Sequence, residues 1–232
     1  MSSDPNRRRW RPGAAALVLC LAPLAACGGE AAPEPADLVK ASLLRLSDLP
    51  RDQEWEVTDD ETDPGLEAFD EELDACERRH DPTAGSAESE QESDTFTGGD
   101  LDSVSSTGWV VRDETKRDAF FDSLDAQFAC VGRALSRYLR GQFPAPVEVE
   151  VATPYELDAE TTADRTSGRA LQVGVAYPGA EVARLTIFID VLAVEEGELL
   201  AGYLFFHTGG ITLEEEADAV GRALDRVRDQ QG

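Results

Sequence analysis

The chain has 232 residues, a length that suits one folded domain with or without a tail. Its 47 acidic residues against 21 basic ones give a formal net charge of −26, which excludes binding to nucleic acid or to an anionic bilayer through charge. Hydrophobic residues make up 41% of the chain, enough for a packed core, whereas two histidines and four cysteines are too few for a zinc cluster.

The N-terminus has the pattern of a bacterial export signal. Several arginines within residues 1–12 precede an apolar stretch over 13–26, which is shorter than the roughly 20 residues of a membrane-spanning helix. The stretch runs into Leu24-Ala25-Ala26-Cys27, which resembles the lipobox of bacterial lipoproteins, where a diacylglyceryl group joins the Cys thiol and the peptide is cut before it. A plain secretory peptide with an incidental cysteine is the alternative.

This lipobox predicts where the mature protein resides. Residues 1–26 are expected to be removed as a lipoprotein signal peptide after Sec export, since Trp10-Arg11 departs from the twin-arginine pattern. Cys27 is expected to carry acyl chains such as palmitate and to anchor the chain at the extracytoplasmic side of the cell membrane. Residues 27–37 have no apolar periodicity, which predicts a lipidated, disordered tether before a domain over 38–232.

Two cysteines remain for the folded part of the chain. Cys20 leaves with the signal peptide and Cys27 is lipidated, so that Cys76 and Cys130 are left. Thiols outside the cytoplasm most often pair, which predicts a Cys76–Cys130 disulfide. Two separate buried thiols are the alternative. No feature of the sequence places a histidine and an acid to activate either thiol as a nucleophile.

Two helices and two strands are predicted in the first half of the domain. Apolar residues at helical spacing predict a short helix over 64–79 and a long helix that Asp113 caps and that ends near residue 141. Between them, strands are predicted at about 92–98 and 103–111, joined by a glycine turn.

Four strands and a helix are predicted in the second half. The strands are marked by alternating or continuous apolar residues, at 147–151, 171–177, 185–191 and 199–206. The polar run 158–168 is interpreted as a loop. Thr212 and Glu215 form a capping box before the last helix. The apolar stripe of this helix is predicted to consist of Leu213, Ala217, Val220, Leu224 and Val227.

The fold class that follows is α+β: a single domain with an antiparallel sheet of about six strands flanked by helices. The strands 185–191 and 199–206 are separated by roughly seven residues. This connection is too short for a parallel crossover, which needs a dozen or more residues, so antiparallel pairing is predicted.

Several motifs together resemble a group of exported proteins. They are the lipobox, Asp48-Leu49-Pro50 followed by Trp55, the cysteine pair, and a hairpin at Gly197 followed by a helix. The chain is similar to actinobacterial exported lipoproteins and sensor domains, among them the extracellular sensor domain of the PknH kinase and the LpqN and PsbP-like α/β sandwiches. The resemblance implies an antiparallel sheet flanked by helices, with an open cleft that binds a ligand or partner. The sensor domain usually has two disulfides, whereas this chain can form one, and no ligand-binding position of the group maps onto a residue of this chain.

His207 is the strongest catalytic candidate in the sequence. It ends an apolar strand, and Asp190 lies on the neighbouring strand, so a serine could complete a triad. However, the chain lacks the G-x-S-x-G elbow, and a half-buried structural histidine is the simpler interpretation. No catalytic residue is therefore assigned. His80, near a loop, is expected to be exposed.

Neither a metal site nor a ligand pocket is assigned from the sequence. An acidic run approaches the spacing of a calcium loop but has Pro64 where the turn glycine belongs, so we interpret it as solvated acid; its residues are Asp59, Glu61, Asp63 and Asp70. Five aromatic residues could line an apolar pocket, although aromatic residues in strands more often belong to the core. They are Trp55, Trp109, Tyr155, Tyr177 and Tyr203.

The function expected from the sequence is a non-enzymatic cell-envelope lipoprotein with a sensor-like domain that binds a ligand or partner. No cofactor is expected, and the partners are the membrane, through the lipid anchor, and a small ligand or envelope protein that the sequence does not identify. A secreted hydrolase that uses His207 is one alternative, and a structural envelope protein with an acidic interaction face is another.

Overall fold

The computed structural model describes residues 33–232, except residue 52 and the segments 59–66, 100–101, 143–146 and 178–183. The predicted signal peptide, Cys27 and the tether up to residue 32 lie outside the described residues. The folded domain is therefore described without the N-terminal segment.

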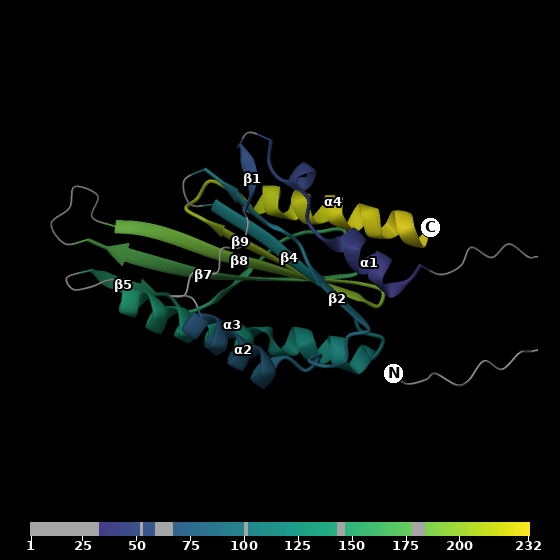
Figure 1. Cartoon of the computed structure of the whole chain (residues 1–232), viewed down its shortest axis with the longest axis horizontal. Helices are drawn as coiled ribbons and strands as arrows, with labels where there is room; N and C mark the ends of the chain where they lie inside the picture. The colour runs from purple at the N-terminus through teal and green to yellow at the C-terminus, as the bar shows by residue number, and fades with distance from the viewer. Residues whose placement is uncertain (1–32, 52, 59–66, 100–101, 143–146, 178–183) are drawn as a thin grey trace, which may run out of the picture. The chain divides into compact units, whose positions relative to one another are not determined.

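In the described part of the chain, nine strands form one antiparallel sheet in the order β1-β3-β4-β9-β8-β7-β5, with β2 paired to β4 and β6 paired to β7 (Figure 1). The strands are β1 Trp55–Thr58, β2 Ser89–Glu92, β3 Thr95–Gly98, β4 Asp102–Val110, β5 Glu148–Val151, β6 Tyr155–Leu157, β7 Arg165–Ala176, β8 Arg184–Glu196 and β9 Leu199–His207. The predicted α+β class with an antiparallel sheet is confirmed.

The predicted number of about six strands is too low, for local reasons. The strand expected at 92–98 is two strands, β2 and β3, which pair with successive parts of β4. Ser93 interrupts them, and its Oγ accepts a hydrogen bond from the Ser106 amide at 2.9 Å. The strands β1 and β6 are only four and three residues long, and β7 begins inside the polar run that was interpreted as a loop.

The helices are α1 Pro35–Ser42, α2 Glu67–His80, α3 Glu114–Gln142 and α4 Leu213–Gln231, with a short 3₁₀ helix, η1, at Leu46–Asp48. The predicted tether is wrong at its C-terminal end, because α1 already begins at Pro35. Proline suits the first turn of a helix, where its missing N–H is not needed. The capping box of α4 is confirmed: the Thr212 amide donates to Glu215 Oε2 at 2.8 Å, and the Glu215 amide donates to Thr212 Oγ1 at 3.3 Å.

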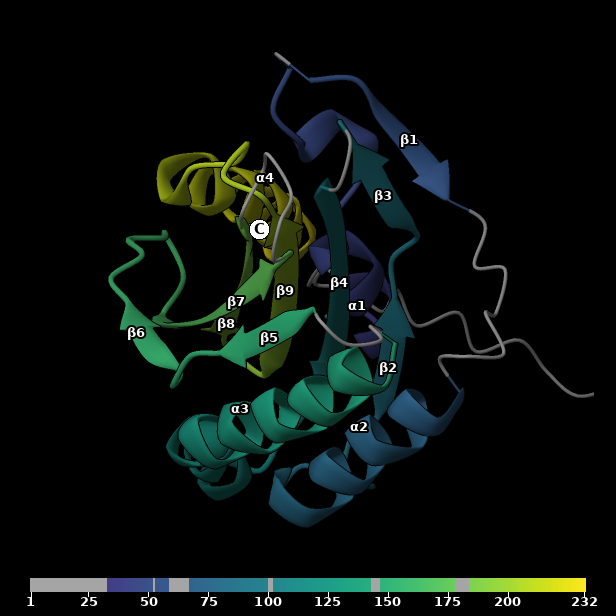
Figure 2. The ribbon, with the colours of Figure 1, turned by 90° about the vertical axis from the view of Figure 1, so that its left-hand side faces the viewer.

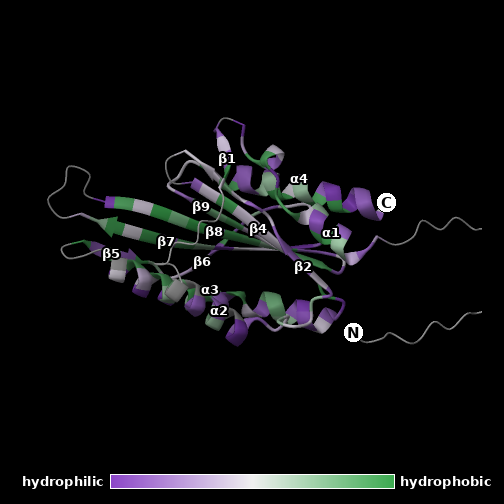
Figure 3. Ribbon diagram, in the orientation of Figure 1, coloured by the Kyte–Doolittle hydropathy of each residue, from purple (hydrophilic) through white to green (hydrophobic). Residues whose placement is uncertain are grey.

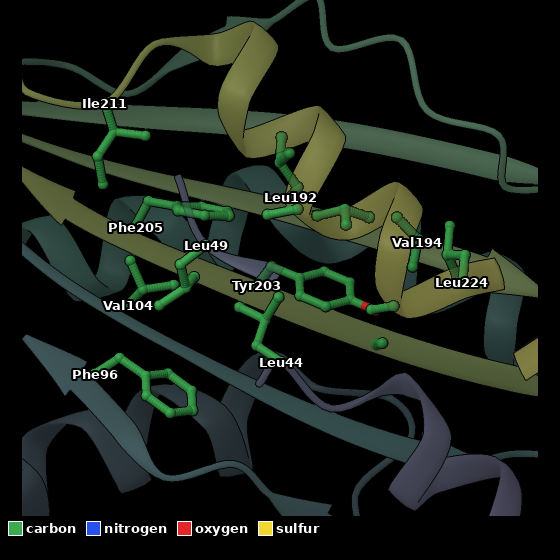
Figure 4. Packing of buried hydrophobic residues seen from close by; sticks show 14 residues of the cluster. Leu44, Leu49, Phe96, Val104, Leu192, Val194, Tyr203, Phe205, Ile211 and Leu224 are labelled. Atoms are coloured by element: carbon green, nitrogen blue, oxygen red, sulfur yellow. The ribbon is translucent and has the colours of Figure 1, made fainter. Parts of the chain in front are cut away.

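The helices cover the sheet on its two faces. Figure 1 shows α1 and α4 on one side and α2 and α3 on the other, and Figure 2 shows α2 alongside α3. Figure 3 shows hydrophobic residues along the central strands and hydrophilic residues on the outer sides of the helices. The core under α4 is built from Leu192 and Val194 of β8, Tyr203 and Phe205 of β9, and Leu224 of α4 (Figure 4).

The last hairpin fixes the register of the two central strands. Glu196 of β8 pairs with Leu199 of β9, so the turn between them consists of two residues. Gly197 occupies the turn at φ 61°, a conformation that glycine adopts without steric cost. The predicted antiparallel pairing is confirmed, and this register places His207 at the end of β9, near Asp190 of β8.

Candidate functional site

The structure contains the disulfide that the sequence predicts. Cys76 of α2 and Cys130 of α3 are bonded, with their Cα atoms 5.7 Å apart and both residues buried. About two helical turns from the bond, the rings of Phe69 and Tyr138 also join the two helices and stack at 4.9 Å between centroids. The disulfide therefore connects the outer helix α2 to α3, which covers the sheet.

The other sequence candidates do not form a shared site. Asp59, Glu61 and Asp63 lie outside the described residues, and so does the side chain of Asp70. His80 ends α2 and is partly buried rather than exposed, contrary to the expectation.

The aromatic candidates are distributed over different parts of the domain. Tyr203 is fully buried under α4 and donates its hydroxyl hydrogen to the Ser42 carbonyl at 3.0 Å. Trp109 packs edge-on against Phe120 of α3, on the opposite face of the sheet. Tyr155 is 43% exposed on the edge strand β6. Tyr177 packs with the apolar cluster under α3, and Trp55 borders a groove described below.

His207 lies in a buried cluster with two carboxyl groups. Its Nε2 is 3.2 Å from Asp190 Oδ2 and 3.5 Å from Oε1 of Glu216, in the first turn of α4. The exposed fractions of His207, Asp190 and Glu216 are 5%, 7% and 0%. Three elements, β8, β9 and α4, therefore bring two acids to one imidazole nitrogen in the protein interior.

The hydrogen bonds of His207 define its neutral tautomer. The Gly209 amide donates to His207 Nδ1 at 3.2 Å, so Nδ1 carries the lone pair and Nε2 carries the proton. The proton on Nε2 faces the carboxyl groups of Asp190 and Glu216. The ring of Phe188 stacks on the imidazole at 5.4 Å between centroids and shields one of its faces.

The two acids of the cluster lack partners for most of their oxygen atoms. Within the described residues, no donor group reaches Asp190 Oδ1 or either carboxyl oxygen of Glu216, all of which are buried, so the hydrogen bond between the two acids requires a proton on Glu216. Burial, followed by the negative charge of Asp190, raises the pKa of Glu216 to about 9. The N-terminus of α4 favours an ionised acid by only about 0.3–1 kcal/mol, which does not offset burial. The raised pKa favours the uncharged carboxylic acid form of Glu216 at neutral pH.

Glu216 is the member of the cluster that the sequence reasoning missed. The predicted apolar stripe of α4 ran through Ala217, but the buried face runs through Glu216, Ala219 and Val220, and Ala217 is only partly buried. Glu216 precedes Val220 by four residues and so occupies a stripe position. An acid at a core position of an amphipathic helix is the signal that could have identified it.

The contacts of His207 do not match those of the hydrolase alternative. A triad needs a hydroxyl or thiol within hydrogen-bond reach of one imidazole nitrogen. In the part of the chain that the structure describes, Nε2 meets two carboxyl groups and Nδ1 accepts from a backbone amide. Cys76 and Cys130 are oxidised. The arrangement is suited to holding protons or a cation rather than to activating a nucleophile.

A groove lies between η1, the segment that follows it, and the N-terminal half of α4. Its two adjoining parts have volumes of about 340 and 430 Å³. The side chains that line them are Leu46, Ser47, Leu49, Pro50, Arg51, Gln53, Trp55, Glu215, Asp218 and Arg222. Apolar residues alternate with two guanidinium and two carboxyl groups, so the groove offers both hydrophobic and ionic contacts.

Arginines of α4 hold the groove in place. Arg226 forms a two-pronged ion pair with the buried carboxylate of Asp48, at 2.7 Å to Oδ1 and 2.8 Å to Oδ2. Arg222 donates from Nε to the Asp48 carbonyl at 2.9 Å, and its Nη2 donates to the same oxygen. The paired geometry of Arg226 is the stronger form of such a contact, so η1 is fixed on α4 before any ligand binds.

Comparison of the chain with models of protein families, with curated proteins and with solved structures finds no match. Among the described helices, none has both the length and the apolar composition that crossing a bilayer requires.

Proposed function

We propose that this protein is a non-enzymatic lipoprotein of the cell envelope, anchored through Cys27, whose α+β domain binds a ligand or partner outside the membrane. The lipobox supports the anchor, and the Cys76–Cys130 disulfide supports an oxidising compartment, because disulfides are rare in the cytoplasm. The resemblance to exported sensor domains favours the same function by analogy.

The observation that carries the binding function is the groove at η1 and α4. Binding sites are commonly concave, mostly apolar and formed in advance, with a few polar groups that orient the ligand. The groove combines Leu46, Pro50 and Trp55 with the guanidinium groups of Arg51 and Arg222. Leu46 is 45% exposed at its border, which leaves apolar surface available to a ligand or partner.

A matched pair of variants tests this proposal. Leu46→Glu places a charge in the groove, whereas Val57→Glu makes the same change at a residue of similar exposure, 48%, on the edge strand β1 outside the groove lining. We expect native mass spectrometry of the protein isolated from its own membrane to show a bound molecule or partner. Because burying an unpaired charge is unfavourable, its occupancy should fall at least about tenfold in Leu46→Glu and remain unchanged in Val57→Glu. The absence of any bound species in the wild-type protein, or equal occupancy in the two variants, would argue against binding in the groove.

A further inference from the structure

The buried cluster of Asp190, His207 and Glu216 has the donor atoms of a metal centre. It presents one imidazole nitrogen and two carboxyl groups, whose potential ligand atoms all lie within 4.8 Å of one another. From these residues we infer that the cluster is a binding site for a single divalent transition-metal ion of the Zn²⁺ type. The site is independent of the groove and adds a second kind of ligand to the protein.

The two distances from His207 fit the edges of a zinc tetrahedron, and the third separation, between the two acids, is at most 4.8 Å. Zinc binds imidazole nitrogen and carboxylate oxygen at about 2.0–2.1 Å, so two ligand atoms on a tetrahedron stand about 3.3–3.4 Å apart. The separations from His207 Nε2 are 3.2 Å to Asp190 Oδ2 and 3.5 Å to Glu216 Oε1. The ion can therefore enter with small adjustments of side chains that β8, β9 and α4 already hold in place.

Unpartnered oxygen atoms are the independent sign of a missing ligand. Glu216 is completely buried, and as a carboxylate it meets no hydrogen-bond donor at either oxygen within the described residues; Asp190 Oδ1 likewise meets none. Burying a polar group without a partner costs free energy, and buried acids in proteins are normally paired or bound to metals. A dication between the two carboxylates would compensate both at once.

The combination of nitrogen and oxygen donors favours a transition metal. Calcium and magnesium are bound by oxygen ligands and retain several waters or many carbonyl groups. Imidazole together with carboxylates suits Zn²⁺ and its first-row neighbours. The burial of all three side chains also disfavours magnesium, which keeps several of its waters when it binds.

Binding requires two proton movements that the surroundings permit. Glu216 gives its proton to solvent, and the His207 proton moves from Nε2 to Nδ1, so that the Nε2 lone pair faces the metal. The Gly209 amide, which donates to Nδ1 at 3.2 Å, must then turn away. Gly209 is exposed and has φ 101°, a conformation open to glycine, and the exposed neighbours Thr208 and Gly210 offer the ion a route from solvent.

Zinc titration of the purified full chain tests this inference. Isothermal calorimetry with Zn²⁺ alone should show one site per chain. Glu216→Gln should weaken binding at least about tenfold, since even loss of an outer partner of a metal ligand has that effect. The control Glu214→Gln changes an exposed acid of the same helical turn and should alter the affinity by less than about twofold, because exposed charges are screened.

Cobalt provides a second readout that does not depend on affinity. Co²⁺ bound by the imidazole, the two carboxylates and one water in a tetrahedral site should give an intense visible absorption in the wild-type protein and in Glu214→Gln, and this absorption should be lost in Glu216→Gln. Absence of a stoichiometric site, equal Zn²⁺ affinity of the two variants, or a cobalt spectrum of octahedral, surface-bound ion would each overturn the inference.

Discussion

Replacing Cys76 and Cys130 together by alanine is expected to lower the free energy of unfolding by about 2–5 kcal/mol. The bond closes a span of 54 residues, and opening it restores conformational entropy to the unfolded chain. The outer helix α2 packs chiefly against α3, where its other contacts include the ring pair of Phe69 with Tyr138 and the ion pair of Glu72 with Arg137. The ion pair is largely exposed and contributes little, so the disulfide holds α2.

Denaturant unfolding of the double variant and of the wild type measures this loss. Amide exchange should accelerate first in α2, because local opening of that helix no longer has to break a covalent bond. In the unreduced wild type, thiol labelling after denaturation should find neither Cys76 nor Cys130 free. A variant that unfolds within about 0.5 kcal/mol of the wild type, with α2 equally protected, would show that the disulfide does not hold the helix.

Glu216→Gln is expected to stabilise the metal-free protein, and to do so more strongly as pH rises. The pKa of Glu216 is raised from 4.5 to about 9 by burial and then by the charge of Asp190. Between these two pH values the folded state holds a proton that the unfolded state releases, so wild-type stability from this group falls as pH increases. Because of this group, the free energy of unfolding of the wild type falls by at most about 1.4 kcal/mol per pH unit. The Glu216→Gln variant lacks this pH dependence, because glutamine does not titrate.

Unfolding experiments at pH 5 and pH 7.5, with a chelator present, measure the effect. The difference in stability between Glu216→Gln and wild type should grow by up to about 3 kcal/mol across this interval. Glu214→Gln, in the same turn but exposed, should follow the wild-type pH dependence. Parallel pH curves for Glu216→Gln and wild type would show that Glu216 is ionised in the folded protein.

Periodic segments of the sequence predicted the large elements well because their local patterns agree with the fold. The valines of β5, the two-residue turn at Gly197 and the capping box at Thr212 each specify one structure over a few residues. The edge strands were not predicted, because their own residues carry no local pattern that specifies a strand. β6 spans three residues, and such a segment is defined by its pairing with β7 rather than by its own residues. α1 was missed because Pro33 and Pro35, at its N-terminal end, resemble a linker.

The buried cluster could be predicted only in part. Asp190 and His207 belong to neighbouring strands, so the hairpin register was enough to bring them together. Glu216 approaches from a helix on one face of the sheet, and its contact depends on how α4 packs there, which periodicity alone does not determine. The sequence places Glu216 four residues before Val220 and so on the apolar stripe, but the predicted stripe included Ala217 in its place. The groove depends on the ion pair of Arg226 with Asp48, which lie far apart in the chain.

The proposed function depends most directly on the lipid anchor inferred at Cys27, which would place this domain outside the membrane, and the mass of the mature N-terminal peptide tests that anchor. We expect mass spectrometry of the protein from its native membrane to show a chain that begins at Cys27 and bears a diacylglyceryl group, and we expect Cys27→Ala to abolish membrane retention or to leave the uncut precursor. A mature chain that begins elsewhere without lipid, or a Cys27→Ala variant that stays membrane-bound at the same mature mass, would contradict the account.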